Sequence, residues 1–304
     1  MRKKLLFIYN VHAGKELIKN KLAGILDIFA KAGYEITAYP TQRSKDAEEK
    51  TREDAGDYDL LVCSGGDGTL DEVVTGMMNR TERIPIGYIP AGSTNDFANS
   101  LGLPKNMLHA ARVAVRGEGF PCDIGAFNDN FFVYIAAFGI FTDVSYLTPQ
   151  ERKNVLGHMA YVLEGVKRLY SIKSYRIRVT YDNDSKVIED EFMFGMVTNS
   201  RSVGGFKSII GKHVVLDDGV FEVTLIKKPT NPIELNEILS SLLIKEINTK
   251  HMYTFRTGNL HIECREEIPW TLDGEFGGEH THVFIENHHR AVEIMVKKPE
   301  IALK

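Results

Sequence analysis

The sequence has few cysteines and no long hydrophobic run. Its three cysteines, Cys63, Cys122 and Cys264, lie far apart and form no CxxC pair. Neither a disulfide framework nor a zinc ribbon is therefore indicated, and a reducing cytoplasm fits best. No stretch of about 18 uninterrupted apolar residues occurs, and the apolar run at 5–9 is too short for a signal peptide. We expect a cytoplasmic protein that contacts membranes only peripherally.

Several catalytic signatures and any strong excess of charge are also missing. The sequence contains no GxxxxGK[ST] loop, no GxGxxG fingerprint and no HExxH, so the P-loop, Rossmann and zincin classes lack their motifs. Lys and Arg total 37 against 41 Asp and Glu, a formal net charge of −4, which argues against a nucleic-acid partner. At 304 residues, the chain is long enough for two domains.

The hydrophobic pattern changes near Asp123. Before it, short apolar runs alternate with segments of helical period, which predicts an α/β domain with a parallel sheet. We expect strands at 5–9, 34–39, 60–63 and 84–89, and helices at 16–32 and 71–79. After it, β-branched and aromatic runs between turn clusters predict an antiparallel β domain with helices near 155–170 and 232–246. The expected domains are 1–124 and 125–289, with about 290–304 a candidate to return to the first.

A glycine-rich loop follows the apolar strand that ends at Cys63. In Gly65-Gly66-Asp67-Gly68-Thr69, three glycines let backbone N–H groups approach phosphate oxygens, helped by the positive end of the following helix. A carboxylate at Asp67 would repel phosphate directly, but it could hold a divalent cation that bridges the phosphates. A plain strand-to-helix turn with a surface aspartate remains the alternative for this motif alone.

Two further loops follow predicted strands in the same way. After 84–89 comes Gly92-Ser93-Thr94-Asn95-Asp96-Phe97-Ala98, whose small residues and hydroxyls suit phosphate or ribose contacts. Asp96 could be a second carboxylate, while helix capping is the favoured role for Asn95. After 5–9 comes the polar and small segment 10–15. Since ligands bind at the carboxyl ends of strands in open α/β sheets, we expect the three loops to converge.

Taken in order, these motifs resemble a known family. Together with Asp123-Ile124-Gly125, Leu216-Asp217-Asp218-Gly219 and Leu272-Asp273-Gly274-Glu275, the two glycine-bearing motifs are similar to those of the soluble bacterial diacylglycerol kinases, relatives of the sphingosine kinases. The resemblance covers essentially the whole chain, although the first motif alone is shared with NAD kinases and phosphofructokinases. It implies a doubly wound nucleotide-binding domain of NAD kinase/phosphofructokinase type and an antiparallel β-sandwich. The implied reaction is ATP- and Mg²⁺-dependent phosphorylation of diacylglycerol or a related lipid, giving phosphatidic acid or a lipid phosphate.

The resemblance also implies residue roles. Nucleotide binding falls on Asn10, Val11, His12, Ala13, Gly14, Thr41, Gly65, Gly66, Asp67, Gly68, Thr69, Leu70, Asp71 and Thr94. The general base falls on Glu275, and the aspartates that hold the catalytic magnesium, largely through water, are Asp67, Asp96, Asp123 and Asp273. A separate structural magnesium falls on Asp218 with the backbone oxygens of Val215 and Val220. Asp71 departs from the family, where many members carry Asn, which puts the role of that side chain in doubt.

Asp273 and Glu275 are also candidates on spacing alone. In an extended segment, residues two apart point to the same face. Phosphoryl transfer to an alcohol needs a carboxylate to accept the hydroxyl proton and a cation to offset charge on the phosphoryl oxygens. The two acids could divide these tasks. An exposed acidic hairpin is the alternative.

Other features have plain explanations beside functional ones. The late histidines, His280, His282, His288 and His289, fit surface strand and turn positions better than a metal site. The loop at 202–207 could be a substrate lid or a plain connection. The basic stretch 152–173 could rest on an anionic membrane that carries the lipid substrate, or pack as an ordinary helix. An edge strand of the β domain could form a homodimer.

Two alternatives to a lipid kinase remain. One is a soluble-substrate kinase of NAD kinase type, and the other is a non-catalytic nucleotide- or lipid-binding protein.

Overall fold

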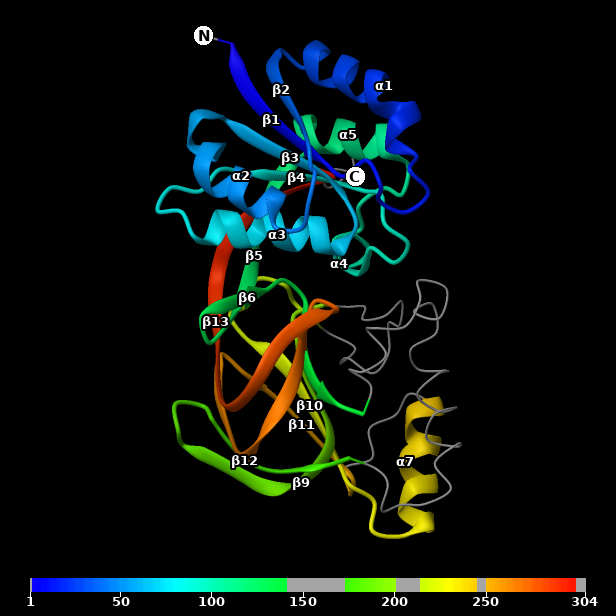
Figure 1. Cartoon of the computed structure of the whole chain (residues 1–304), viewed down its shortest axis with the longest axis vertical. Helices are drawn as coiled ribbons and strands as arrows, with labels where there is room; N and C mark the ends of the chain where they lie inside the picture. The colour runs from blue at the N-terminus through cyan, green and yellow to red at the C-terminus, as the bar shows by residue number, and fades with distance from the viewer. Residues whose placement is uncertain (1, 141–172, 201–213, 245–249, 299–304) are drawn as a thin grey trace, which may run out of the picture. The chain divides into compact units, whose positions relative to one another are not determined.

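The computed structural model describes residues 2–140, 173–200, 214–244 and 250–298 (Figure 1). Contacts divide the chain into unit 1, Met1–Cys122 with Arg290–Lys304, and unit 2, Asp123–His289. The predicted helix at 155–170, the loop at 202–207 and all but Lys173 of the basic stretch lie outside the described residues. Among the described helices, none is long and apolar enough to span a bilayer.

Unit 1 is built on a parallel sheet. Its strands are β1 (Lys3–Tyr9), β2 (Tyr34–Pro40), β3 (Leu60–Gly65) and β4 (Ile86–Pro90). They lie in the order β2-β1-β3-β4, and the end of β13 (Glu275–Val296) adds beside β4 through Ile294 and Ile86. Residues 5–8 of β1 are fully buried, so both faces of the sheet are covered, as is typical of parallel sheets.

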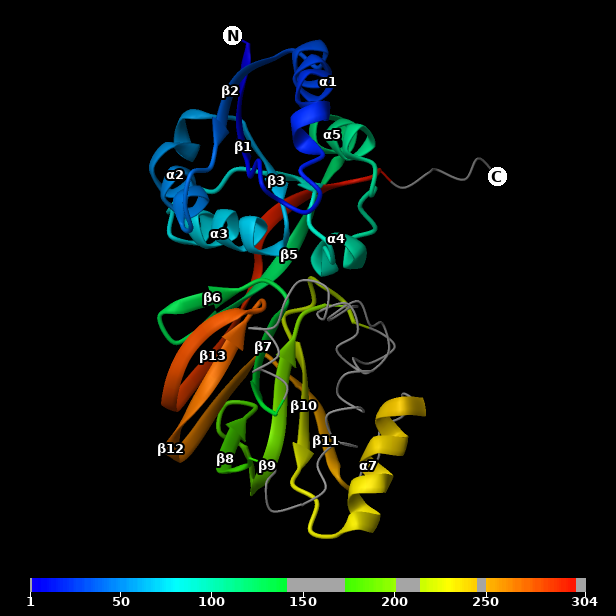
Figure 2. The ribbon, with the colours of Figure 1, turned by 45° about the vertical axis from the view of Figure 1, so that its right-hand side comes forward.

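Helices cover both faces of this sheet (Figure 2). α1 (Ile18–Lys31) and α5 (Met107–Arg116) pack on one face, where Phe29 meets Phe7 edge to face at 5.3 Å between ring centres. α2 (Asp46–Asp54) and α3 (Asp67–Met78) pack together on the other face, and α4 (Asp96–Ser100) is a short helix after β4. The predicted strands and helices are therefore present in this unit. α3 begins four residues before the predicted start at Asp71, and β4 begins directly after Pro85.

Unit 2 is mainly antiparallel. Its strands are the end of β5 (Glu118–Phe127), β6 (Asn130–Phe132), β7 (Ile135–Gly139), β8 (Tyr175–Tyr181), β9 (Lys186–Thr198), β10 (Phe221–Lys227), β11 (Met252–Thr257), β12 (Asn259–Leu272) and the start of β13. β7 and β8 each pair with both β9 and β12, whereas β10 joins β9 to β11. α7 (Pro232–Ile244) begins at a proline, as expected for a first helical position.

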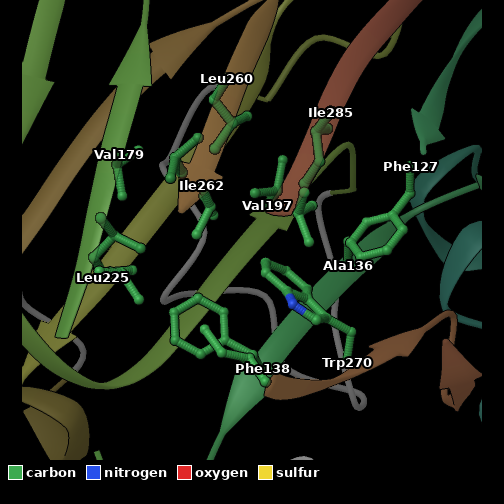
Figure 3. Packing of buried hydrophobic residues seen from close by; sticks show 14 of the residues in the cluster. Phe127, Ala136, Phe138, Val179, Val197, Leu225, Leu260, Ile262, Trp270 and Ile285 are labelled. Carbon is green, nitrogen blue, oxygen red and sulfur yellow. The ribbon is translucent and has the colours of Figure 1, made fainter. Parts of the chain in front are cut away.

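An apolar core lies in the described part of unit 2 (Figure 3). The indole of Trp270 lies 5.0 Å from the ring of Phe127 and 4.8 Å from that of Phe138, measured between centres. Aliphatic side chains from β8, β10 and β12 complete the cluster, including Val179, Leu225 and Ile262. The predicted fold class, an α/β unit followed by an antiparallel β unit, is confirmed.

Candidate nucleotide and catalytic site

Three loops of unit 1 meet at the carboxyl ends of its central strands. The loop after β1 is tied to β3 because the Asn10 N–H donates to the Ser64 carbonyl oxygen at 2.9 Å. The loop after β4 is tied to β3 because the Ala91 N–H donates to the Gly65 carbonyl oxygen at 2.7 Å. The convergence expected from the parallel sheet is therefore present in the structure.

Glycines allow this close approach. A Cβ atom added to Gly92 would lie 2.7 Å from the Cα atom of Gly66, closer than real side chains come. Gly14 has a φ of +57°, and a Cβ atom there would collide with the Ala91 carbonyl oxygen. Any side chain at Gly14 or Gly92 would therefore push the three loops apart.

Tyr88 and Asn95 hold the loops after β3 and β4 in place. The buried Tyr88 hydroxyl lies 3.3 Å from the Gly65 carbonyl oxygen and 3.4 Å from Asn95 Oδ1. Burial raises the pKa of Tyr88, and the nearby Asp67 carboxylate raises it further. Asn95 precedes α4, but its side chain bonds both the N–H and the carbonyl oxygen of Gly92, at 2.9 and 2.8 Å, and makes no helix cap. The capping role favoured for Asn95 is therefore wrong, because its amide closes the loop instead.

A pocket of about 470 Å³ opens beside these loops, which is a size typical of small-molecule sites. Eight predicted nucleotide residues line it: Asn10, His12, Ala13, Gly14, Thr41, Gly66, Gly68 and Thr69. The other six do not belong to its lining: Val11, Gly65, Asp67, Leu70, Asp71 and Thr94. Among these six, the Leu70 side chain is buried in the core, so only its backbone could face a ligand.

The pocket wall includes four residues to which the sequence patterns assign no role: Gln42, Arg43, Ser44 and Glu72. Glu72, on α3, accepts the N–H groups of Lys45 at 2.8 Å and Ala47 at 3.1 Å. Burial raises the pKa of Glu72, whereas these two N–H groups lower it. The Glu72 carboxylate therefore holds the loop after β2 against the helix that carries the glycine-rich motif.

Asp46 secures the same loop from its other side. Its carboxylate accepts the Gln42 N–H at 2.7 Å and the Tyr39 hydroxyl at 2.9 Å. Two buried or half-buried acids thus fix the segment between Thr41 and Ala47. Sequence spacing gives no signal for Glu72, because its acceptor role depends on residues 25 and 27 positions earlier in the chain.

Two predicted metal-binding aspartates lie at neighbouring helix starts in unit 1. Asp67 is the first residue of α3, and its Oδ2 accepts the Asp96 N–H at 3.3 Å. Asp96 is the first residue of α4 and is buried. Carboxylate oxygens are the ligands that Mg²⁺ prefers. Asp67 and Asp96 are therefore the residues at these two helix starts that could offer carboxylate oxygens to a magnesium ion.

The Asp273 and Glu275 segment of unit 2 is a turn. Asp273 and Gly274 have φ angles of +50° and +91° and connect β12 to β13, with Leu272 paired to Glu275. Asp-Gly favours two-residue hairpin turns of this kind. The prediction that both acids share one face of an extended segment is therefore wrong: Asp273 is buried in the turn, whereas Glu275 is exposed at the start of β13.

The Asp273 carboxylate accepts three backbone N–H groups. The donors are Val133 at 2.5 Å, Tyr134 at 3.0 Å and Ile135 at 2.9 Å. In addition, the Asp273 N–H donates to the Ile135 carbonyl oxygen at 2.9 Å. Asp273 therefore fixes the turn to the start of β7, which gives Glu275 a defined place in unit 2.

Asp123 is hydrogen-bonded to a second acidic turn of unit 2, the turn that contains Asp218. Its Oδ2 accepts the Gly219 N–H at 2.6 Å and lies 3.3 Å from Asn287 Nδ2. In the same turn, Asp218 Oδ1 accepts the Val220 N–H at 3.3 Å, and Asp218 Oδ2 accepts the Arg256 guanidinium. Both Asp218 oxygens thus face N–H donors, and this arrangement does not fit the structural magnesium that the resemblance implies.

The late histidines bind protein groups. A ring nitrogen of His289 lies 2.9 Å from the Asp217 carbonyl oxygen, and one of His280 lies 3.0 Å from that of Gly277. His261 stacks on the exposed Phe284 with 4.0 Å between ring centres. Within the described ranges, no three His, Cys, Asp or Glu side chains form a group that could hold a metal ion.

Comparisons with known proteins decide the family. Residues 4–127 match the diacylglycerol kinase catalytic domain, and residues 136–296 match the "YegS C-terminal NAD kinase beta sandwich-like domain". The chain is 34% identical to a diacylglycerol kinase of Bacillus subtilis (strain 168), over 97% of each chain. The chain belongs to the diacylglycerol kinase family.

Further relatives agree with this assignment. A diacylglycerol kinase of Staphylococcus carnosus (strain TM300) is 35% identical, over 98% of this chain and 96% of the relative. A crystal structure of a diacylglycerol kinase from Bacillus anthracis str. Sterne superimposes with a TM-score of 0.75 at 25% identity, covering 97% of each chain. As a member of this family, the chain is a lipid kinase, a phosphotransferase with an alcohol group as acceptor.

Proposed function

We propose that this kinase transfers the γ-phosphoryl group of ATP to the hydroxyl of diacylglycerol, gives phosphatidic acid and requires Mg²⁺. The observation that carries the nucleotide half is the pocket of unit 1, whose wall is formed by Asn10, His12–Gly14, Thr41 and the start of α3. The first N–H groups of a helix have no acceptor within the helix and bind phosphate oxygens well. In α3 they belong to a glycine-bearing turn that leaves room for phosphate.

Asp67 and Asp96 would hold the magnesium ion on the nucleotide side. The ion supplies positive charge that offsets the charge on the phosphoryl oxygens during transfer. Asp123 and Asp273 are proposed to support the metal through water, as the resemblance implies. In the structure, both carboxylates already accept backbone N–H groups within unit 2, which limits the acceptor sites they can offer.

Glu275 is proposed as the general base. Its exposed carboxylate stands directly after the Asp273-Gly274 turn, at the start of β13. Transfer to an alcohol needs a carboxylate in reach of the hydroxyl proton. The next residue, Phe276, exposes 56% of its surface.

The test is transfer from [γ-³²P]ATP, with Mg²⁺, to a panel of acceptors: diacylglycerol, monoacylglycerol, ceramide, sphingosine and NAD. Labelled phosphatidic acid as the main product supports the proposal. Label on NAD would instead support a soluble-substrate kinase of NAD kinase type. ATP binding without any labelled product would support a non-catalytic nucleotide-binding protein. Omission of Mg²⁺ in the presence of EDTA should abolish the label.

A further inference from the structure

The turn at Asp218 in unit 2 is closed by an arginine from another strand. Arg256, on β11, is the direct cross-strand neighbour of Glu222 on β10. Its Nη2 atom donates to Asp218 Oδ2, and its Nε atom lies 3.2 Å from Glu222 Oε1. One guanidinium thus joins the carboxylate of the turn to the carboxylate at the start of the following strand.

Both oxygens of Asp218 are engaged by N–H donors. Oδ1 accepts the Val220 N–H at 3.3 Å, and Oδ2 accepts Arg256. A magnesium ion needs about six oxygen ligands in near-octahedral geometry, and an ion bound to Asp218 Oδ2 would share that oxygen with the guanidinium of Arg256, so two cations would lie close together. The ion would then stand beside an arginine that is tethered to the neighbouring strand.

The rest of the turn is held independently of any cation. The Gly219 N–H donates to Asp123 Oδ2 at 2.6 Å, and the Asp123 N–H donates to the Leu216 carbonyl oxygen at 2.8 Å. Arg256 already supplies one positive charge to the two carboxylates of Asp218 and Glu222, and its fork of N–H donors matches carboxylate geometry.

We propose that Arg256 takes the place of a divalent cation at the Asp218 turn, so that this kinase folds and stays folded without a structural magnesium ion. Any magnesium dependence of the protein then belongs to the nucleotide side alone. This inference concerns the stability of unit 2 and does not depend on which acceptor is phosphorylated.

The test compares thermal unfolding of the full chain in EDTA and in excess Mg²⁺, without nucleotide. Wild type and Asp218→Asn should be stabilised by Mg²⁺ to the same extent, because any Mg²⁺ that they bind belongs to the nucleotide side. Arg256→Gln should unfold at a lower temperature in EDTA, by about 2–4 °C if the ion pairs have the strength usual at a surface, and Mg²⁺ should restore the loss. Arg176→Gln, which removes an arginine paired with Glu189 at 3.3 Å on neighbouring strands, is the matched control, and its response to Mg²⁺ should equal that of wild type.

Counting bound Mn²⁺ by electron paramagnetic resonance gives a second readout. Wild type and Asp218→Asn should bind the same number of Mn²⁺ ions, while Arg256→Gln should bind one more. A stabilisation by Mg²⁺ that is larger in wild type than in Asp218→Asn, or a Mn²⁺ ion lost in Asp218→Asn, would overturn the proposal. So would a loss in Arg256→Gln that Mg²⁺ does not restore, since Arg256 would then be an ordinary ion-pair partner.

Discussion

Gly68 is a position at which a substitution should weaken nucleotide binding without destabilising the fold. It lies in the first turn of α3 and lines the pocket, and a Cβ atom added to it would meet nothing within 4 Å. Gly68→Ala should therefore leave the free energy of unfolding unchanged or raise it by up to about 1 kcal/mol, because alanine favours helix. The KM for ATP should nevertheless rise, because the added methyl group would occupy the space of a phosphate.

Urea unfolding and an ATP titration check both parts of this prediction. Unfolding serves as the internal control, since it reports any damage to the protein without nucleotide. An unchanged KM for ATP in Gly68→Ala would mean that the phosphates do not lie on the start of α3.

At the scale of single residues, the sequence predicts the glycines of the site but not the side chains that hold the loops in place. Gly66 and Gly92 stand out because three loops after parallel strands must meet at one sheet edge. The sequence assigns no role to Tyr88 or Glu72, because each acts through partners brought near only by folding. A tyrosine within an apolar strand looks like any other core residue until its hydroxyl is seen at the Gly65 carbonyl oxygen.

The loop between β2 and α2 depends on one side chain of α3. Glu72→Gln replaces one acceptor oxygen by an NH₂ group that would face the N–H of Lys45 or Ala47. We expect the loop to loosen and the KM for ATP to rise about tenfold, equivalent to roughly 1.4 kcal/mol, with a smaller change in kcat. Steady-state kinetics with ATP varied gives both parameters.

Glu53→Gln, on the exposed surface of α2, is the matched control for Glu72→Gln and should leave both parameters unchanged. A fall in kcat without any change in the KM for ATP would show that the Glu72 carboxylate does not act through the pocket wall.

The turn between β12 and β13 rests on the Asp273 carboxylate. Asp273→Asn keeps one acceptor oxygen and places an NH₂ group against buried N–H donors, so it should lower the free energy of unfolding by about 1–3 kcal/mol. The loss should appear in magnesium-free buffer, where a role confined to metal binding would have no effect. Asp184→Asn, in an exposed turn and with a φ of +64°, is the control. Equal urea midpoints for Asp273→Asn and wild type would contradict this structural role.

At the scale of elements, local patterns predict most positions correctly and misplace some ends. The start of α3 is expected at Asp71 because glycines usually interrupt helices, yet Gly68 lies in the first helical turn, where the cost is small. The Asp273-Gly274 pair carries a strong hairpin signal, but the extended interpretation neglects it. Asp273 and Glu275 consequently differ in burial. Simple alternation along a strand would place them on the same face and would not give this difference.

The two units follow from a change in hydrophobic period along the chain. Parallel strands buried on both faces, such as β1, give continuous apolar runs, while β8 and β12 of unit 2 alternate between buried and less buried positions. That contrast in the sequence is enough to predict two different sheet types. The core of unit 2, centred on Trp270, could not be predicted in detail, because it joins side chains from strands far apart in the sequence.

For the whole molecule, the account assigns nucleotide binding to unit 1 and proton removal to Glu275 of unit 2. The most direct test is the rate of phosphatidic acid formation by Glu275→Gln, measured beside its affinity for ATP. The account predicts a rate lower than that of wild type by a factor of about 10² to 10⁴, with ATP affinity and unfolding unchanged. A rate close to that of wild type would contradict it.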